Sequence, residues 1–435
     1  MMNLMEDTPM KRILSVILCV VFVLSFAACK KDENGRSEHS LLGDYERSDS
    51  VPEFDFTSGE VEVTEEYMTW AEGVASFSFS LLSEVAGDEN VVISPLSVAN
   101  VMAVLANGAE GTTLKELRQT LAGVDLDLIN ASLYYLNSRL SAFNTDSAYF
   151  KTADSLWFDD SFDVKASFLQ AVANFYDAEV MRVAMADRAV VDKMNEWISD
   201  NTDGEITDAV GDIDPSSLAV AVNAVIMNDE WVTAYTEAQM SEGVFHGKEG
   251  DKTASYMTSK EHYISTAYAK GFVKGFKNLP LKFAAIMPTD DMSAEEFAEK
   301  LTVARWQALL DSQQATSFCV AKLPEFDMYT KSNLTDTLKA LGIEKAFDAD
   351  KADFSNLSNT GEPYISKVTQ DAFIKVGPLG AKAGSATVAL VAPGAAKPGE
   401  VEIPQLTFDK PFVFVIYDNE SGVPVFMGIV NNTGK

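Results

Sequence analysis

The stretch that decides the fold is NVVISPLSVANVMAVLANGAEGTTLKEL, residues 90–117. Within it, Ser94 followed by Pro95 predicts the start of a helix. A serine hydroxyl can accept a hydrogen bond from a free amide of the first turn, and proline needs no amide partner there. Small and apolar residues continue the helix to Gly108, and the threonines after it open a second one. A helix that is apolar on most faces must be buried at the centre of a sizeable protein.

The composition argues against two classes of function. The 435 residues include 34 Lys and Arg against 65 Asp and Glu, a formal net charge of -31 that repels phosphate backbones, so no nucleic-acid partner is expected. The three histidines and three cysteines are scattered, without metal-ligand spacing or a nucleophile motif. We therefore expect no metal, no cofactor and no enzymatic activity.

The N-terminus has the order of an export signal. Lys11 and Arg12 precede the apolar run of residues 13–28, which is short for a membrane span and ends in small residues. The ending FAAC resembles a bacterial lipobox and predicts lipidation of Cys29; ordinary signal cleavage is the alternative. The KKDE that follows is similar to the export tag of Bacteroidetes surface lipoproteins.

These features divide the chain into three parts. Residues 1–29 are expected to be the lipoprotein signal peptide. Residues 30–64 are polar and acidic, with few periodic apolar positions, and are expected to form a flexible tether. Residues 65–435 are expected to form one folded domain, which begins with an amphipathic helix from Tyr67 to Val85. The protein is then anchored to the bacterial outer membrane, on its surface or periplasmic face.

Further motifs follow the deciding stretch in a fixed order. They are NEWI (195–198) with Thr202 and Gly204, the strand-like 218–225 ending in NAV, Trp231, LPEF (323–326), residues 334–338, LGI (341–343), Phe347, ADFS (352–355) and FDKPFVFVIYDNESGVPVFMGIV (408–430). Over residues 65–432 this ordered set resembles the serpin family of serine protease inhibitors. The resemblance implies an α+β serpin fold: three β-sheets with a large central sheet A, about nine surrounding helices, and an exposed reactive-centre loop near the C-terminus.

The resemblance also implies a latch that closes the central sheet. Its residues here are Ser94, Ser97, Asn223 and Gln370, where glutamine stands in place of the family's histidine. Glutamine can both donate and accept hydrogen bonds, so Gln370 can still join the other three residues in a hydrogen-bonded network. The other interpretation is ordinary helix capping and core hydrogen bonding.

Residues 364–376 alternate like a strand and lead into the small, flexible stretch 377–406. With Gly380 as the family's hinge glycine, alternate residues from Ala381 on are small or β-branched and share one face of a strand. No proline interrupts the ladder before Pro393. This pattern suits a segment that slides into an existing sheet, although Pro378 replaces the family's acidic residue. The expected hinge is Gly380, Ala381, Lys382, Ala383, Gly384, Ser385, Ala386 and Thr387.

The family mechanism implies a suicide-substrate inhibitor. A target protease would cleave the loop, form a covalent acyl-enzyme and be trapped as the hinge inserts into sheet A. Counting from the hinge puts the scissile bond at Gly394–Ala395, with Ala396 and Lys397 as alternatives. The small residues there predict elastase- or subtilisin-like targets. The inhibitor is expected to be a monomer. The alternatives are a non-inhibitory serpin that acts as a binding module, and an inhibitor of cysteine proteases.

Overall fold

The structure is a computed structural model that describes residues 40–56, 63–176, 178–202, 204–208, 210–211, 213, 219–289, 292–360, 363–381 and 403–433. The predicted signal peptide with Cys29, the hinge residues from Lys382 to Thr387 and the predicted scissile region 394–397 lie outside these residues. Among the described residues, no helix has both the length and the apolar character needed to cross a membrane.

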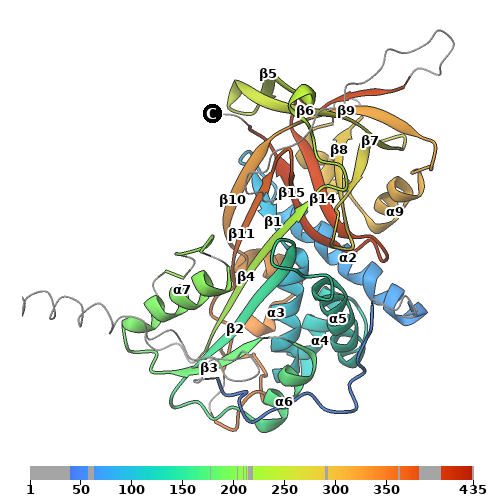
Figure 1. Cartoon of the computed structure of the whole chain (residues 1–435). Coiled ribbons are helices and arrows are strands. Elements are labelled where there is room, and N and C mark those ends of the chain that lie inside the picture. The colour runs from blue at the N-terminus through green and yellow to red at the C-terminus, as the bar shows by residue number, and fades with distance from the viewer. Residues whose placement is uncertain are drawn as a thin grey trace, which may run out of the picture.

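The described part of the chain combines nine α-helices with two hydrogen-bonded sheets, which confirms the α+β class (Figure 1). The helices are α2 (Glu65–Val85), α3 (Pro95–Gly108), α4 (Gly111–Leu121), α5 (Leu126–Ser141), α6 (Ala166–Phe175), α7 (Ala189–Asn201), α8 (Ala294–Lys300), α9 (Val303–Asp311) and α10 (Thr335–Ala340). Two 3-10 helices cover Glu237–Gln239 and Lys345–Phe347.

The six-stranded sheet has the order β10-β11-β12-β4-β2-β3. Its strands are β2 (Tyr149–Asp159), β3 (Glu179–Val183), β4 (Ala219–Glu230), β10 (Phe326–Asn333), β11 (Thr369–Val376) and the two-residue β12 (Gly380–Ala381). This sheet corresponds to the large central sheet that the resemblance implies.

The nine-stranded sheet has the order β1-β15-β14-β8-β7-β6-β9-β13, and β5 pairs with β6. Its strands are β1 (Val91–Ile93), β5 (Met240–Gly247), β6 (Gly250–Ser265), β7 (Ala269–Gly275), β8 (Leu281–Pro288), β9 (Phe318–Pro324), β13 (Gln405–Thr407), β14 (Phe412–Asp418) and β15 (Pro424–Val430). Strand β6 is 16 residues long and pairs with three strands in turn: residues 250–257 pair with β5, residues 256–262 with β9 and residues 262–265 with β7. The two smaller sheets that the resemblance implies are therefore joined by hydrogen bonds into one sheet in this structure.

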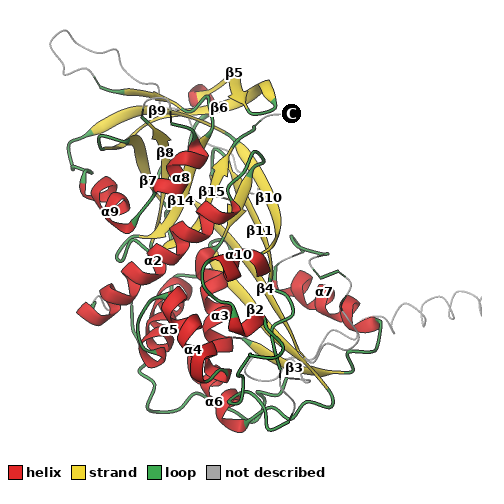
Figure 2. Ribbon diagram, turned by 180° about the vertical axis from the view of Figure 1, so that it is seen from behind, coloured by secondary structure: helices red, strands yellow, loops and turns green. Residues whose placement is uncertain are grey.

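Helix α3 begins as its sequence predicts. The Ser94 hydroxyl accepts a hydrogen bond from the amide of Ser97 at 3.4 Å, and Pro95 takes the first helical position. All but Asn107 of its residues are buried, because α3 lies at the centre of the molecule between the six-stranded sheet and helices α2, α4, α5 and α6 (Figure 2). Helix α2 begins two residues before the expected Tyr67, where Thr64 caps it.

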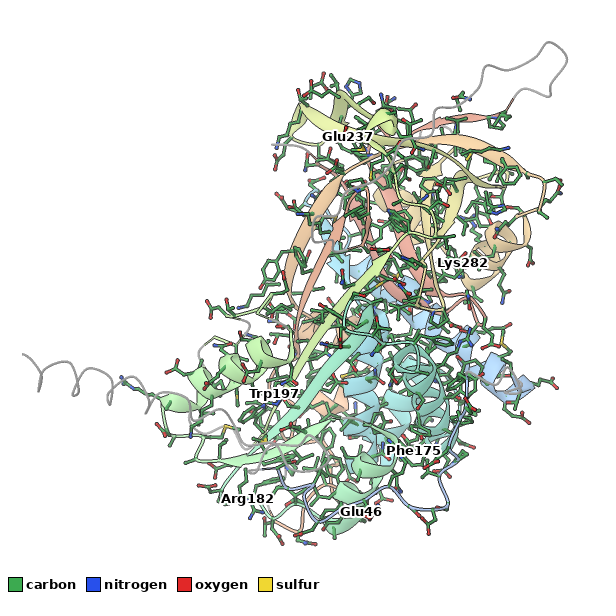
Figure 3. All side chains as sticks on the ribbon, in the orientation of Figure 1. Glu46, Phe175, Arg182, Trp197, Glu237 and Lys282 are labelled. Atoms are coloured by element: carbon green, nitrogen blue, oxygen red, sulfur yellow. The ribbon has the colours of Figure 1, made fainter. Side chains whose placement is uncertain are left out.

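Helix α7 covers the opposite face of the six-stranded sheet and has a small core of its own. Its residues Val190, Met194 and Ile198 pack with Trp157 of β2 and Met181 of β3. The ring of Trp197, labelled in Figure 3, meets that of Trp157 edge-on at 6.5 Å. Helix α7 therefore covers the part of the sheet formed by β2, β3 and β4, whereas β10 keeps an exposed side.

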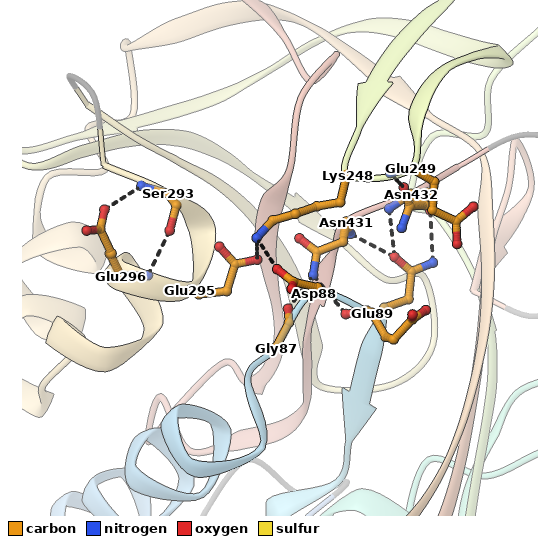
Figure 4. A network of polar contacts seen from close by, with 11 residues as sticks. Gly87, Asp88, Glu89, Lys248, Glu249, Ser293, Glu295, Glu296, Asn431 and Asn432 are labelled. Carbon is orange, nitrogen blue, oxygen red and sulfur yellow. Dashed lines mark hydrogen bonds and ion pairs between the residues drawn. The ribbon is translucent and has the colours of Figure 1, made fainter.

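The C-terminus is fixed by a polar network (Figure 4). The side-chain oxygen of Asn90 accepts hydrogen bonds from the amides of Asn431 and Asn432 at 2.7 and 2.8 Å. The Lys248 ammonium lies between Asp88, at 2.8 Å, and Glu295, at 3.1 Å. The turn after α2, the β5–β6 turn, α8 and the chain end are thereby held together.

The expected flexible tether of residues 30–64 needs a correction over residues 40–56, which are packed on the body. Leu42 is fully buried, and the Leu41 amide donates to the carbonyl of Val180 in β3 at 2.6 Å. The ring of Phe56 meets that of Tyr135 edge-on at 5.2 Å. The apolar residues here have no helical or strand period, so composition alone predicted a tether although single side chains anchor the segment.

We predict that Leu42→Ala lowers the free energy of unfolding by about 2–5 kcal/mol, because it leaves a cavity under the N-terminal segment. The midpoint of urea unfolding measures this loss. Asp49→Ala, an exposed position in the same segment, is the control and should leave the midpoint unchanged. Equal midpoints for Leu42→Ala and the unaltered protein would contradict the packing of this segment.

Candidate functional site

The upper end of the six-stranded sheet holds the first two hinge residues. Strand β12 lies between β4 and β11, with Gly380 opposite Glu230, and Ala381 opposite both Asp229 and Val376. A Cβ atom at Gly380 would lie 1.9 Å from the carbonyl oxygen of Asp229. Only glycine fits while β12 keeps this place, which gives a physical reason for the predicted hinge glycine.

The residues just before the hinge are fixed by their carbonyl oxygens. The Trp231 indole donates to the carbonyl of Gly377 at 2.9 Å, and the Trp231 amide donates to that of Leu379 at 2.8 Å. The Tyr235 amide donates to the carbonyl of Pro378 at 2.8 Å. Because proline still offers its carbonyl, Pro378 fits this place although it has no amide hydrogen.

Directly below β12, strands β4 and β11 pair with each other. They are parallel, and the pairing joins Asp371 to Ala224 and Ala372 to Val225. We call these two residue pairs the seam. At the seam the sheet is closed, whereas above it β12 separates the two strands.

Below the seam the two chains are unpaired again. The segment 364–368, expected to extend the strand, is irregular, and β11 begins only at Thr369. An apolar pocket lies here between residues 219–221 of β4 and residues 363–367, with Leu105, Leu156, Phe158, Phe354 and Leu357 also in its lining. The expected strand is missing over residues 364–368 because this segment pairs with neither neighbour: the pairing with β10 begins at Thr369 and the pairing with β4 at Asp371.

On the α3 side of the seam, the structure brings the four predicted latch residues together. The Gln370 side chain accepts from the Ser94 amide at 3.1 Å and donates to the Ser94 carbonyl at 2.9 Å. It also donates to the Asn223 side-chain oxygen at 3.4 Å, across the gap between β11 and β4. The Asn223 amide group reaches the carbonyl of Ser97, also at 3.4 Å. That this network acts as a latch stays a prediction.

Two details of the network were not expected from the sequence. The hydroxyl of Ser97 is buried without a hydrogen-bond partner, so this residue takes part through its carbonyl. Asp154 of β2, 7% exposed, accepts a hydrogen bond from Asn223. An acidic residue in the middle of the strand 149–159 was the available signal. Since glutamine does not ionise, Gln370 gives the network no titration near neutral pH, unlike a histidine.

The other face of the seam carries a buried acid. Asp371 is 2% exposed and accepts a hydrogen bond from the Tyr329 hydroxyl of β10. Burial raises the pKa of Asp371 above its ordinary value, and the charge of Asp208 acts in the same direction. The Tyr329 hydrogen bond and the charges of Lys331 and Lys367 oppose this rise in pKa.

Metal binding and nucleophilic chemistry depend on how the His, Cys, Asp and Glu side chains of the described residues are placed. No three His, Cys, Asp or Glu side chains among them are placed to hold a metal ion. Burial raises the pKa of the Cys319 thiol to about 12, so it is a poor nucleophile at neutral pH. His246 lies 2.8 Å from Asp251, but both side chains are exposed on the β5–β6 hairpin.

Comparisons with known proteins agree with this geometry. The family model described as "Serpin (serine protease inhibitor)" matches residues 72–433. An uncharacterized serpin-like protein of Methanosarcina acetivorans is 28% identical, over 82% of this chain and 86% of its own length. Leukocyte elastase inhibitor A of Rattus norvegicus is 25% identical, over 81% of this chain and 95% of its own. The crystal structure of the thermophilic serpin tengpin in its native state has a TM-score of 0.81 and 31% identity, covering 91% of this chain and 99% of tengpin.

We predict that Gln370→Ala lowers the free energy of unfolding by about 1–3 kcal/mol, because it leaves the buried amide of Ser94 without a hydrogen-bond acceptor. Urea unfolding measures the loss. Lys375→Ala, an exposed position on the same strand, should have little effect. A small effect at Gln370, equal to that at Lys375, would contradict the importance of the network.

We also predict that Asp371→Asn stabilises the protein at neutral pH. A raised pKa in the folded state means that the stability contributed by this carboxyl is present at acid pH and is lost as the pH rises through the raised value. Asparagine cannot ionise, so the gain should be largest at pH 7–8 and shrink toward pH 4. Thermal unfolding of both proteins across this range measures the difference. A gain that does not change with pH, or one matched by Asp327→Asn on the exposed side of β10, would refute it.

Proposed function

The chain belongs to the serpin family, and from this premise we propose that it inhibits serine endopeptidases as a suicide substrate whose cleaved loop inserts into the six-stranded sheet. Members of the family are generally serine protease inhibitors rather than enzymes. The targets proposed here are elastase- or subtilisin-like proteases, which prefer the small apolar residues around Gly394 and Ala395.

The observation that carries the proposal is the position of β12. Its two residues already occupy the place of a new strand between β4 and β11. Ala381 is 1% exposed and belongs to the main core. Because side chains alternate along a strand, continued insertion would turn Ala383, Ser385 and Thr387 to the same side. All three are small enough to enter a formed core.

Few interactions oppose continued insertion. The seam consists of two residue pairs, and the side-chain contact across it is the 3.4 Å hydrogen bond between Gln370 and Asn223. Below the seam, β4 and residues 363–367 leave an apolar pocket between them that a new strand would fill. Insertion would break the two residue pairs between β4 and β11. In return, the new strand would form hydrogen-bonded ladders with both β4 and β11 and bury additional apolar area.

The chemistry would be supplied by the protease. Its serine oxygen attacks the carbonyl carbon of Gly394, the bond to the Ala395 nitrogen breaks, and that nitrogen leaves with a proton as a new N-terminus. The Gly394 carbonyl remains as an ester on the protease. Insertion would then carry the ester and the protease along the sheet and distort the protease before water can hydrolyse the ester.

We further propose that the protein is an exported, monomeric lipoprotein anchored through Cys29. The path of the chain favours this arrangement: residue 40 joins the body beside β3, at the lower end of Figure 1, whereas β9, the partner of β13 after the loop, lies at the upper end. A protein tethered by its N-terminus would therefore present its loop away from the membrane.

The test mixes the protein from residue 34 onward with elastase, subtilisin and trypsin. We expect a covalent complex that resists denaturant on a gel with elastase or subtilisin, and a released C-terminal peptide whose mass places the cleaved bond at residue 394. A mass corresponding to cleavage after residue 396 or 397 would instead assign the scissile bond to that residue. Cleavage without a complex would overturn inhibition and leave a serpin-shaped binding module, and a complex with papain alone would indicate a cysteine-protease target.

A matched pair of hinge variants sharpens this test. Ala383→Glu places a long charged side chain on the inward face and should give cleavage without a complex, because a buried charge stalls insertion. Lys382→Glu also introduces a negative charge, but on the outward face, and should still form the complex. Loss of the complex in both variants, or in neither, would contradict the proposed register of insertion.

A further inference from the structure

The C-terminal end of strand β4 carries a buried carboxylate, Asp229, that the sequence analysis did not predict to be functional. Asp229 is 2% exposed. Its side chain accepts four hydrogen bonds: from the amides of Glu230 (2.8 Å), Asn278 (3.0 Å) and Leu279 (2.7 Å), and from the Asn278 side chain (2.7 Å). Three of the four come from the turn between β7 and β8. A carboxylate that accepts several N–H groups holds them strongly, since each bond is charge-assisted.

The backbone continues the same connection. The Lys277 amide donates to the carbonyl of Glu230 at 2.8 Å, and the Val232 amide donates to that of Gly275 at 3.0 Å. The end of β4 is thus fixed to the β7–β8 turn on one side. On its other side, the same residues are the partners of the hinge, because Asp229 pairs with Ala381 and Glu230 with Gly380.

The hinge tolerates little movement of this strand end. The missing Cβ of Gly380 would be 1.9 Å from the Asp229 carbonyl oxygen, so the two backbones already touch. A shift of β4 toward β12 would create a clash, and a shift away would break the pairing. The side chain of Asp229 fixes the end of the strand, and the main chain of the same residue pairs with Ala381 of the hinge.

We infer that Asp229 is a positioning residue for loop insertion: by holding the end of β4 on the β7–β8 turn, its carboxylate keeps open the place between β4 and β11 in which Gly380 and Ala381 are seated. This inference rests on the proposed function. Insertion competes with hydrolysis of the acyl-enzyme. When Gly380 and Ala381 are already paired with β4, insertion has only to continue and is fast. When they are not, insertion is slower, more acyl-enzyme is hydrolysed, and more inhibitor is cleaved for each protease trapped.

The experiment compares Asp229→Ala and Asp229→Asn with Lys277→Gln. The control removes the adjacent, half-exposed ion pair of Lys277 with Glu230 and leaves the hydrogen bonds to the Asp229 carboxylate in place. Two quantities are measured in each protein: the moles of inhibitor consumed per mole of protease trapped, and the hydrogen exchange of peptides covering residues 377–381 and 276–279.

For Asp229→Ala we expect a several-fold rise in inhibitor consumed and faster exchange in both peptides. Asp229→Asn keeps one accepting oxygen and should be intermediate, and Lys277→Gln should behave as the unaltered protein. A purely structural role would lower the melting temperature and leave the ratio of trapped to cleaved inhibitor unchanged. Unchanged exchange at 377–381 or an unchanged ratio in Asp229→Ala would overturn the inference.

Failure of the proposed function would be recognised separately. If the unaltered protein formed no complex with any protease, inhibition would be refuted. Hydrogen exchange would still decide whether Asp229 seats the hinge, because that measurement needs no protease. Should Asp229→Ala fail to fold, the same comparison is made with Asn278→Ala, which removes one of the four hydrogen bonds and leaves the carboxylate in place.

Discussion

The seam between β4 and β11 is the constraint on which the rest of the structure depends. Two residue pairs close the six-stranded sheet at Ala224 and Val225, while β12 separates the strands above and an apolar pocket separates them below. A sheet closed at one short place can open there without unfolding.

The two faces of the seam are chemically different. On the α3 side, Gln370 is bonded to the backbone of Ser94 at both its oxygen and its nitrogen, which ties β11 to the capped start of the central helix. On the other side, the buried Asp371 is bonded to Tyr329 of the neighbouring strand. On the first face, the side-chain hydrogen bond that crosses the seam joins the neutral amides of Gln370 and Asn223, whereas the second face carries the carboxyl of Asp371.

Much of this fold could be predicted from the sequence. The capped start of α3 at Ser94 and the amphipathic helix up to Val85 are both present, because each rests on local chemistry: a hydroxyl beside free amides, and apolar residues at helical spacing. Local pattern failed over residues 40–56, where isolated side chains such as Leu42 find partners only in the folded body. It also failed at 364–368, where a strand-like pattern has no neighbour to pair with.

The sequence by itself determined the family and predicted the hinge glycine and the latch residues, since all of these depend on residue types in a fixed order. Only the tertiary structure decided that Gly380 must be a glycine because Asp229 lies against it, that Ser97 contributes its carbonyl rather than its hydroxyl, and that Asp229 fixes the strand end. These contacts join segments some 50 to 150 residues apart in the chain. Their geometry exists only after the sheets have packed, because hydrogen bonds and steric contacts act over a few ångströms and carry no signal along the sequence.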